Sequence, residues 1–290
     1  MSDFVQQNSV LLDFNSSDSW VILSPIEMSI KKKIESVGVP LKDWGISIYR
    51  GVLTGFNEAF IISTEKRDEI LANCQSEEEY RRTDDLIRPI LRGRDIKRYG
   101  YDWAGLWLIN THNGIKGSLD RIHIEDYPSV KAHLDQYWDK ISIRTDKGDT
   151  PYNLRNCAYL DDFNKPKIIW KIIGSNLAFS FDNACVIVNN ACYLMTGENI
   201  ENLLPFLNSR IINWYSDTTN MNPTGVGDAQ VGAQNIGLFP IPKEGIVFDI
   251  NNAHKDYLLI EKEIARVYGL SENELNYILS IYPISSSDNL

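Results

Sequence analysis

Residues 167–195 read KIIWKIIGSNLAFSFDNACVIVNNACYLM and decide the fold class. Short runs rich in branched and aromatic residues alternate with Gly, Asn and Asp, a spacing typical of strands joined by tight turns. The pattern predicts an antiparallel meander. Its four strands are expected over residues 167–172, 177–181, 185–188 and 192–195.

Helical patterns lie on both sides of this stretch. Upstream, Ser24 is placed as an N-cap, with Pro25 at the first helical position and Glu27 three residues after the cap. This capping box predicts a helix that ends at Gly38. Further helices are expected over residues 128–141, 200–215 and 254–268. Together the patterns predict an α+β fold, in which a mixed lobe of short strands and amphipathic helices precedes the meander and the C-terminal helices.

From these patterns we expect four segments along the chain. They are an N-terminal connector over residues 1–24, the N-terminal part of the main domain over 25–165, a β-meander and helical part over 166–282, and a tail over 283–290. A chain of 290 residues can bury one large core or two modest ones.

The composition is that of an ordinary globular protein, with 43% hydrophobic and 23% charged residues. It excludes disordered and collagenous chains. Because there is no apolar run of about 18 residues, we expect no membrane span, and the location is predicted to be cytoplasmic. The four cysteines show no CxxC spacing and the four histidines are scattered, so no metal site is expected from them.

The formal net charge of −10 is unevenly distributed. Residues 81–98 carry seven basic side chains against three acidic ones, and residues 31–56 are also net positive. Six of the seven are arginines, whose planar forks match phosphate oxygens and the guanine edge. A basic face for nucleic acid is one interpretation. The other is a solvated surface whose arginines pair with Asp84, Asp85 and Asp95.

A second basic stretch surrounds Trp170. Strand alternation places Lys167, Ile169 and Lys171 on one face, and we expect that face to point outward, where its lysines can meet phosphate. The alternative is a half-exposed strand with ordinary surface lysines.

Two other functions remain open. Asp85, Asp95 and Lys97 loosely fit the Asp…Asp-x-Lys arrangement of Mg²⁺-dependent nucleases. The amphipathic helix over 128–141 offers a docking face for a partner protein. The sequence has no G-x-S-x-G, glycine-rich phosphate loop or H-E-x-x-H. Residues 222–225 read NPTG and superficially resemble the Asn-Pro-Pro-Tyr motif of amino-methyltransferases, but they lack the second proline and the aromatic residue that would stack on a flipped base. Apart from that nuclease alternative, we expect no catalytic residue in this chain.

Three ordered segments carry a family resemblance. They are YRGVLTGFNEAFI at 49–61, IRPILRGRDIKRY at 87–99 and KPKIIW at 165–170. These closely resemble the TaqI-like C-terminal specificity domain of adenine-specific DNA methyltransferases and of fused type IIG restriction-modification enzymes. Residues 207–210, 238–242 and 267–274 are similar to the closing segments of the family and, more distantly, to type I specificity subunits.

The resemblance implies a target-recognition domain that grips duplex DNA and reads a short sequence. It implies a partner domain or subunit that methylates adenine with S-adenosylmethionine and, where a nuclease part exists, Mg²⁺ for cleavage. The methyltransferase core is absent from this sequence, so we expect no cofactor in the chain itself.

The residues and the resemblance together suggest a set of DNA contacts. Thr54, Gly55 and Asn57 are expected to form a turn near the DNA backbone, and the amides after the helix 200–215 suit adenine edges. The full set of expected DNA-binding residues is Arg50, Thr54, Gly55, Asn57, Arg92, Arg94, Arg98, Lys167, Lys171, Asn220, Asn222 and Gln230.

Overall fold

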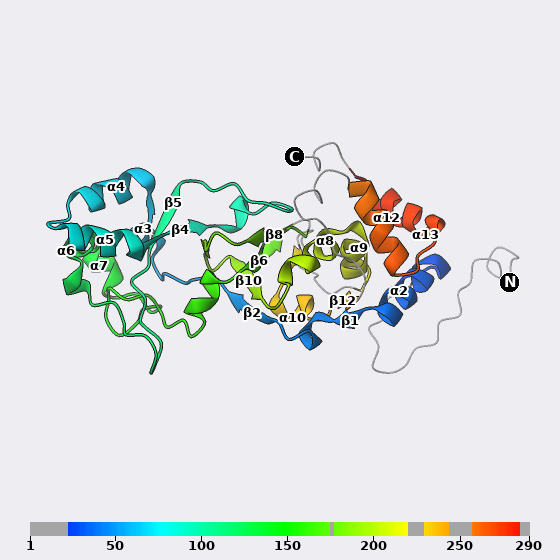
Figure 1. Cartoon of the computed structure of the whole chain (residues 1–290), viewed down its shortest axis with the longest axis horizontal. Coiled ribbons are helices and arrows are strands. Elements are labelled where there is room, and N and C mark those ends of the chain that lie inside the picture. The colour runs from blue at the N-terminus through cyan, green and yellow to red at the C-terminus, as the bar shows by residue number, and fades with distance from the viewer. Residues whose placement is uncertain (1–22, 175–176, 220–228, 244–256, 285–290) are drawn as a thin grey trace, which may run out of the picture. The chain divides into compact units, whose positions relative to one another are not determined.

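The computed structural model describes residues 23–174, 177–219, 229–243 and 257–284 (Figure 1). The chain forms two compact units. One, here the helical unit, comprises the described residues of Met1–Ile46, Gly174–Leu177 and Asn202–Leu290. The other, the sheet unit, comprises Ser47–Ile173 and Ala178–Glu201.

In the helical unit, α2 (Pro25–Val37) begins with the predicted capping box: the Ser24 backbone N–H donates to Glu27 Oε2 over 2.7 Å. Gly38 caps its other end, as predicted. A second capping box, at Ser271, starts α13 (Glu272–Ile281). The two helices lie side by side (Figure 1), and Lys33 Nζ on α2 donates to Glu274 on α13 over 2.7 Å.

The helix expected over residues 200–215 is divided into three pieces. These are η5 (Ile200–Leu203), α8 (Leu204–Asn208) and α9 (Arg210–Thr218). Ser209 separates α8 from α9 because its backbone is extended, and its hydroxyl accepts the Ile212 N–H over 3.0 Å as an N-cap. The last predicted long helix is present as α12 (Tyr257–Val267).

A small antiparallel pair completes the framework of the helical unit. β1 (Val39–Pro40) pairs with β12 (Pro240–Ile241), and the hydroxyl of Tyr268 donates to the Pro240 carbonyl over 2.7 Å. The short elements η1 (Leu41–Asp43), β11 (Ala229–Gln230) and α10 (Ala233–Ile236) accompany them. The core of this unit is built on large, almost fully buried side chains: Trp214, Phe239, Tyr268, Leu41, Ile30 and Ile34.

The sheet unit contains two four-stranded sheets. In the first sheet the order is β2 (Ser47–Arg50), β10 (Cys192–Thr196), β6 (Lys167–Lys171), β8 (Phe179–Asp182), with every neighbour antiparallel. In the second sheet the order is β3 (Ile61–Ser63), β5 (Leu106–Ile109), β4 (Ile87–Leu91), β9 (Ile187–Val188), and only the β4–β9 pair is parallel. The two-residue strand β7 (Ile173–Gly174) follows β6.

The predicted meander is only partly right. β6, β8 and β10 share one sheet, but the third predicted strand, β9, joins β4 in the second sheet. Both residues of β9 are buried, and the Asn189 N–H after it donates to the Leu91 carbonyl over 3.0 Å. Runs of apolar residues show that a strand is buried but do not show which sheet buries it.

The division expected between residues 165 and 166 does not match the two units. β2, from the first part of the chain, pairs with β10, from the second, so the first sheet needs both parts. Of the expected N-terminal connector, only residues 23 and 24 are described, and the strand pairing places residues 47–201 together except for Gly174–Leu177.

Helices cover the second sheet: α3 (Asn57–Phe60), α4 (Thr64–Ala72), α5 (Glu77–Leu86), α6 (Pro128–Asp135) and α7 (Trp138–Ile141). The last two replace the single helix expected over 128–141. Val130, Leu134 and Ile141 from that predicted face are completely buried in the core. The core thus uses the apolar face that the docking alternative needed. The mixture of helices and sheets confirms the α+β prediction. No described helix is both long and apolar enough to cross a membrane.

Candidate nucleic-acid interface

Basic residues gather at one end of the first sheet. β2 and β6 both run antiparallel to β10, so their last residues, Arg50 and Lys171, lie at the same end. With one strand between them they are about 10 Å apart. The register pairs Arg50 with Tyr193 and Lys171 with Cys192, so the two side chains start from opposite faces. Arg50 is exposed, and its Nε donates to the Asn190 carbonyl over 2.8 Å.

A turn formed by residues 93–101, the basic turn, packs on this end. It starts with η2 (Gly93–Asp95), where a Cβ on Gly93 would lie 3.3 Å from Lys171 Cβ. Its far side is attached to β8, since the Tyr99 N–H donates to the Phe179 carbonyl over 2.9 Å. The basic turn carries Arg94, Lys97 and Arg98. We call these three residues, with Arg50 and Lys171, the basic end.

Arg92 and Asp95 brace the basic turn internally. Arg92 Nη2 lies 2.8 Å from Asp95 Oδ1, and its Nε lies 3.0 Å from Oδ2, a bidentate pair. Asp95 also accepts the Arg92 backbone N–H over 2.8 Å. Burial alone would raise the pKa of Asp95, but the hydrogen bonds from Arg92 hold it below its usual value. Arg92, expected to contact DNA, therefore has its fork occupied within the protein.

Lys167 is a correction to the sequence interpretation. It is completely buried, and its Nζ forms an ion pair with Asp182 and donates to the Phe163 carbonyl over 2.8 Å. Ile169, on the same face of β6, is also fully buried in the core, so only Lys171 at the end of that face is partly exposed. Asp182 in turn accepts the Tyr101 hydroxyl over 3.0 Å, which fixes the end of the basic turn.

Two cations of the basic turn, Arg94 and Lys97, are exposed. Arg94 is exposed, and no ion pair or hydrogen bond involves its side chain within the described residues. The side chain of Lys97 is 59% exposed, and its Nζ lies 3.8 Å from the carboxylate of Asp102, whose side chain is 82% exposed. An exposed pair this long contributes little to stability and is easily exchanged for a phosphate.

The remaining arginines of the 81–98 stretch lie elsewhere. On α5, Arg81 pairs with Glu77 over 3.3 Å, and Arg82 Nε donates to the Asp126 carbonyl over 2.7 Å. On β4, the Arg88 guanidinium donates to the Cys185 carbonyl over 3.0 Å. The stretch is therefore not one basic face. The helix-to-strand change at residue 87 separates Arg81 and Arg82 from the arginines that follow.

The turn at Thr54 is structural rather than exposed. Thr54 is buried and its hydroxyl donates to Asn57 Oδ1 over 2.6 Å. Gly55 has φ +70°, and a Cβ there would lie 2.6 Å from the Asp146 carbonyl oxygen. Of the three residues expected to contact DNA here, Gly55 and Asn57, the latter at the start of α3, are exposed, whereas Thr54 is not. The expectation that Thr54 contacts DNA is therefore wrong, because its polar atoms are used inside the fold.

Arg144 holds this turn in place, which the sequence did not indicate. Its guanidinium donates to four carbonyl oxygens and lies 4.4 Å from the centre of the Phe60 ring. The carbonyls belong to Thr54, Asp146, Pro151 and Asn153. In the sequence, Arg144 cannot be distinguished from a surface arginine. Its structural role is evident only from the carbonyl groups that it contacts in the folded chain.

Three predicted contacts remain undescribed. Asn220 and Asn222 lie outside the described residues. Gln230 ends β11, but its side chain is not among those described.

The nuclease arrangement is not assembled. Asp85 is on α5 and Asp95 is in η2, at opposite ends of β4. Both oxygens of Asp95 are bonded to Arg92. Across the described ranges, no group of three His, Cys, Asp or Glu side chains is placed to hold a metal ion.

Gly51 fixes the approach of β2 to the 189–192 turn. A Cβ there would lie 2.1 Å from the Asn189 carbonyl oxygen and 2.4 Å from that of Val188. We expect Gly51→Ala to lower the free energy of unfolding by about 2 kcal/mol, because backbone atoms would have to move. Urea unfolding tests this, with Gly100→Ala as the control, since its Cβ would meet nothing within 4 Å. Equal stabilities of the two variants would contradict the assignment.

Comparison with known protein families identifies the family of this chain. The model of the TaqI-like C-terminal specificity domain matches residues 88–241, just over half of the chain. The chain therefore belongs to the TaqI-like C-terminal specificity domain family. This confirms the predicted family and the role of a restriction-modification specificity domain. The match includes the basic turn, β6 and β10.

Among particular relatives, the chain is similar to the type II methyltransferase M.PaeR7I of Pseudomonas aeruginosa. The two are 22% identical over 274 residues, which cover 90% of this chain and 44% of that enzyme. One solved structure that matches is that of the type IIG restriction endonuclease BpuSI, with 14% identity, a TM-score of 0.47, and coverage of 91% of this chain and 31% of that one. The type IIL restriction-modification enzyme MmeI in complex with DNA matches with 13% identity, a TM-score of 0.49, and coverage of 94% and 37%. The chain spans less than half the length of each of these proteins.

Proposed function

We propose that this chain binds duplex DNA through the basic end and reads a short sequence for a separate methyltransferase part. The observation that carries the proposal is the convergence of Arg50, Lys171 and the basic turn at one sheet end, in a chain whose family is a specificity domain. Three of the five cations belong to a turn that is braced from inside, so the backbone that carries them is held in place before DNA arrives.

The overall charge of −10 does not oppose this binding. At physiological salt, charges act over a Debye length of about 8 Å, so a phosphate at the basic end experiences mainly the nearby cations. Phosphate contacts set affinity and orientation but carry no sequence information. The acidic remainder of the chain repels DNA and so favours docking through this one end.

We infer that the chemistry belongs to a partner domain or subunit. M.PaeR7I is a type II methyltransferase, and this chain corresponds to only 44% of its length. In our proposal that partner transfers a methyl group from S-adenosylmethionine to adenine, and any nuclease partner uses Mg²⁺. We also propose that the complex is cytoplasmic, because both reactions require access to DNA inside the cell.

Charge reversal of Arg94 tests the interface. We expect Arg94→Glu to weaken binding to duplexes of every sequence by about tenfold or more, because a charge-assisted contact is replaced by repulsion. The slope of log affinity against log salt should fall by about one. Fluorescence anisotropy over a salt series measures both quantities.

Arg81→Glu is the matched control, since Arg81 is 76% exposed on α5 and lies outside the basic end. If Arg94→Glu and Arg81→Glu bind alike, the basic end does not contact DNA. If the unmodified chain binds no duplex even at low salt, the proposed function itself fails.

A further inference from the structure

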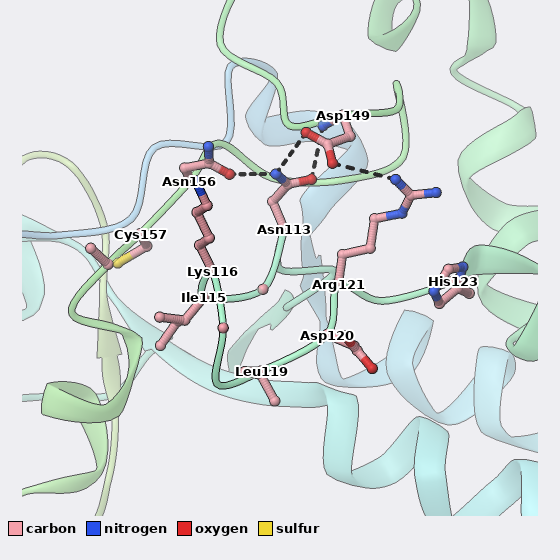
Figure 2. A pocket seen from close by; sticks show the side chains of 13 residues that line it. Asn113, Ile115, Lys116, Leu119, Asp120, Arg121, His123, Asp149, Asn156 and Cys157 are labelled. Carbon is pink, nitrogen blue, oxygen red and sulfur yellow. Dashed lines mark hydrogen bonds and ion pairs between the residues drawn. The ribbon is translucent and has the colours of Figure 1, made fainter.

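The sheet unit has an open cavity of about 890 Å³ that the sequence did not indicate (Figure 2). Its walls come from two loops, residues 113–123 and 149–158. Asn113 stands between them. Its Oδ1 accepts the Asp149 backbone N–H over 2.8 Å, and its Nδ2 donates to Asp149 Oδ1 over 3.0 Å and also to Asn156 Oδ1. Every polar atom of the Asn113 amide is thus used to join the loops.

The neighbours of Asn113 retain unused hydrogen-bonding groups. Arg121 Nη1 lies 3.3 Å from Asp149 Oδ2, which leaves the other guanidinium donors available. Asn156 accepts from Asn113, and its Nδ2 makes no hydrogen bond within the part of the chain that the structure describes. The hydrogen bond from Asn113 lowers the pKa of Asp149, so this carboxylate is an ionised acceptor at neutral pH. Donors and acceptors therefore stand side by side on one wall.

The charge of the cavity distinguishes it from the basic end. Lys116 and Arg121 are balanced by Asp120 and Asp149 among the lining residues. A phosphate would meet two carboxylates here, whereas a neutral group with both donors and acceptors would be matched. Nucleobase edges have this character: arginine pairs with guanine, asparagine with adenine, and aspartate accepts from cytosine. The volume lies within the range of about 300–1,000 Å³ of ligand cavities.

We propose that Arg121, Asp149 and Asn156 contact base edges of the target sequence, with Asn113 as the residue that positions them. This inference rests on the proposed function, because it requires that the basic end bring duplex DNA to the chain. In this proposal the basic end supplies affinity for duplex DNA of any sequence, and the cavity supplies the preference for the target sequence.

Selection from duplexes with a randomised segment tests the inference on the complete chain. We expect Asn156→Ala to lower the preference at one base position by about tenfold, because one polar contact is lost. Asn156→Asp keeps the oxygen that Asn113 bonds but presents a second oxygen in place of Nδ2. It should therefore change which base is preferred at that position. The salt slope of Asn156→Ala should equal that of the unmodified chain, since no phosphate contact changes.

Arg81→Ala, an exposed arginine away from the cavity, is the control, and the unfolding midpoint of each variant is compared with that of the parent. Unchanged preferences in both Asn156 variants would overturn the inference while leaving DNA binding by the basic end intact. A parent chain that binds all duplexes equally would also overturn it. Loss of all DNA binding in the parent would instead refute the proposed function.

Discussion

Replacing Lys167 by alanine is expected to lower the free energy of unfolding by about 3–5 kcal/mol, because it leaves the Asp182 carboxylate buried without its counter-charge. Neither side chain of this pair has any exposed surface. Asp182 would keep the Tyr101 hydroxyl at 3.0 Å and the Ala184 and Val186 N–H groups at 3.2 Å. These neutral donors cannot replace an ammonium group.

Urea unfolding measures this loss, and Lys165→Ala is the control. Lys165 also pairs with an aspartate, Asp162 at 2.8 Å, but its side chain is 56% exposed, so its loss should cost less than about 1 kcal/mol. Similar losses for the two lysines would refute the buried-pair assignment. Should Lys167→Ala fail to fold, Tyr101→Phe probes the same network, with an expected loss of about 1 kcal/mol.

Replacing Glu261 by glutamine is expected to stabilise the protein above pH 7 by about 3 kcal/mol and to change little near pH 4.5. Burial raises the pKa of Glu261 from 4.5 to about 7, although its Oε1 accepts the Arg210 N–H over 2.6 Å. Its other oxygen, Oε2, is buried with no hydrogen bond inside the described ranges.

The sign follows from which state binds the proton more tightly. The folded protein holds the proton of Glu261 up to a higher pH than the unfolded chain does, so protonation stabilises the fold. This stabilisation is complete below pH 4.5 and is lost as the pH rises through about 7. Glutamine is neutral at every pH and removes the loss.

Unfolding of parent and variant at the same series of pH values tests this expectation. Glu263→Gln is the control on the same helix, since its carboxylate is 42% exposed and pairs only with Arg266 among described residues. A stability difference for Glu261→Gln that stays constant from pH 4.5 to 8 would show that its carboxylate does not titrate as expected.

The sequence predicts local elements of the fold well where the signal is local. The capping box at Ser24 and the stop at Gly38 are both present in α2. The sequence does not predict the partner of each strand, because β9 and β10 are both short and largely buried but join different sheets. Long-range register depends on packing between segments, which periodicity does not encode.

For the candidate site, too, the sequence predicts some features and not others. The motif at 87–99 includes most of the basic turn, although its first arginine, Arg88, lies on β4. Whether each arginine is available could not be read from the sequence: Arg92 is bonded to Asp95, whereas Arg94 is exposed. Asn113, Asp149 and Asn156 lie in three separate stretches without a motif, so only the folded chain reveals that they meet.

The arrangement of the two units along the chain has a consequence for how such proteins diversify. The sheet unit is encoded almost without interruption by residues 47–201, with the helical unit contributed by residues before and after it. Both the basic end and the polar cavity fall inside that block. In the function proposed above, recombination at the two borders of this block would exchange the residues that meet DNA and leave the flanking helices unchanged, so one genetic event would alter the target preference.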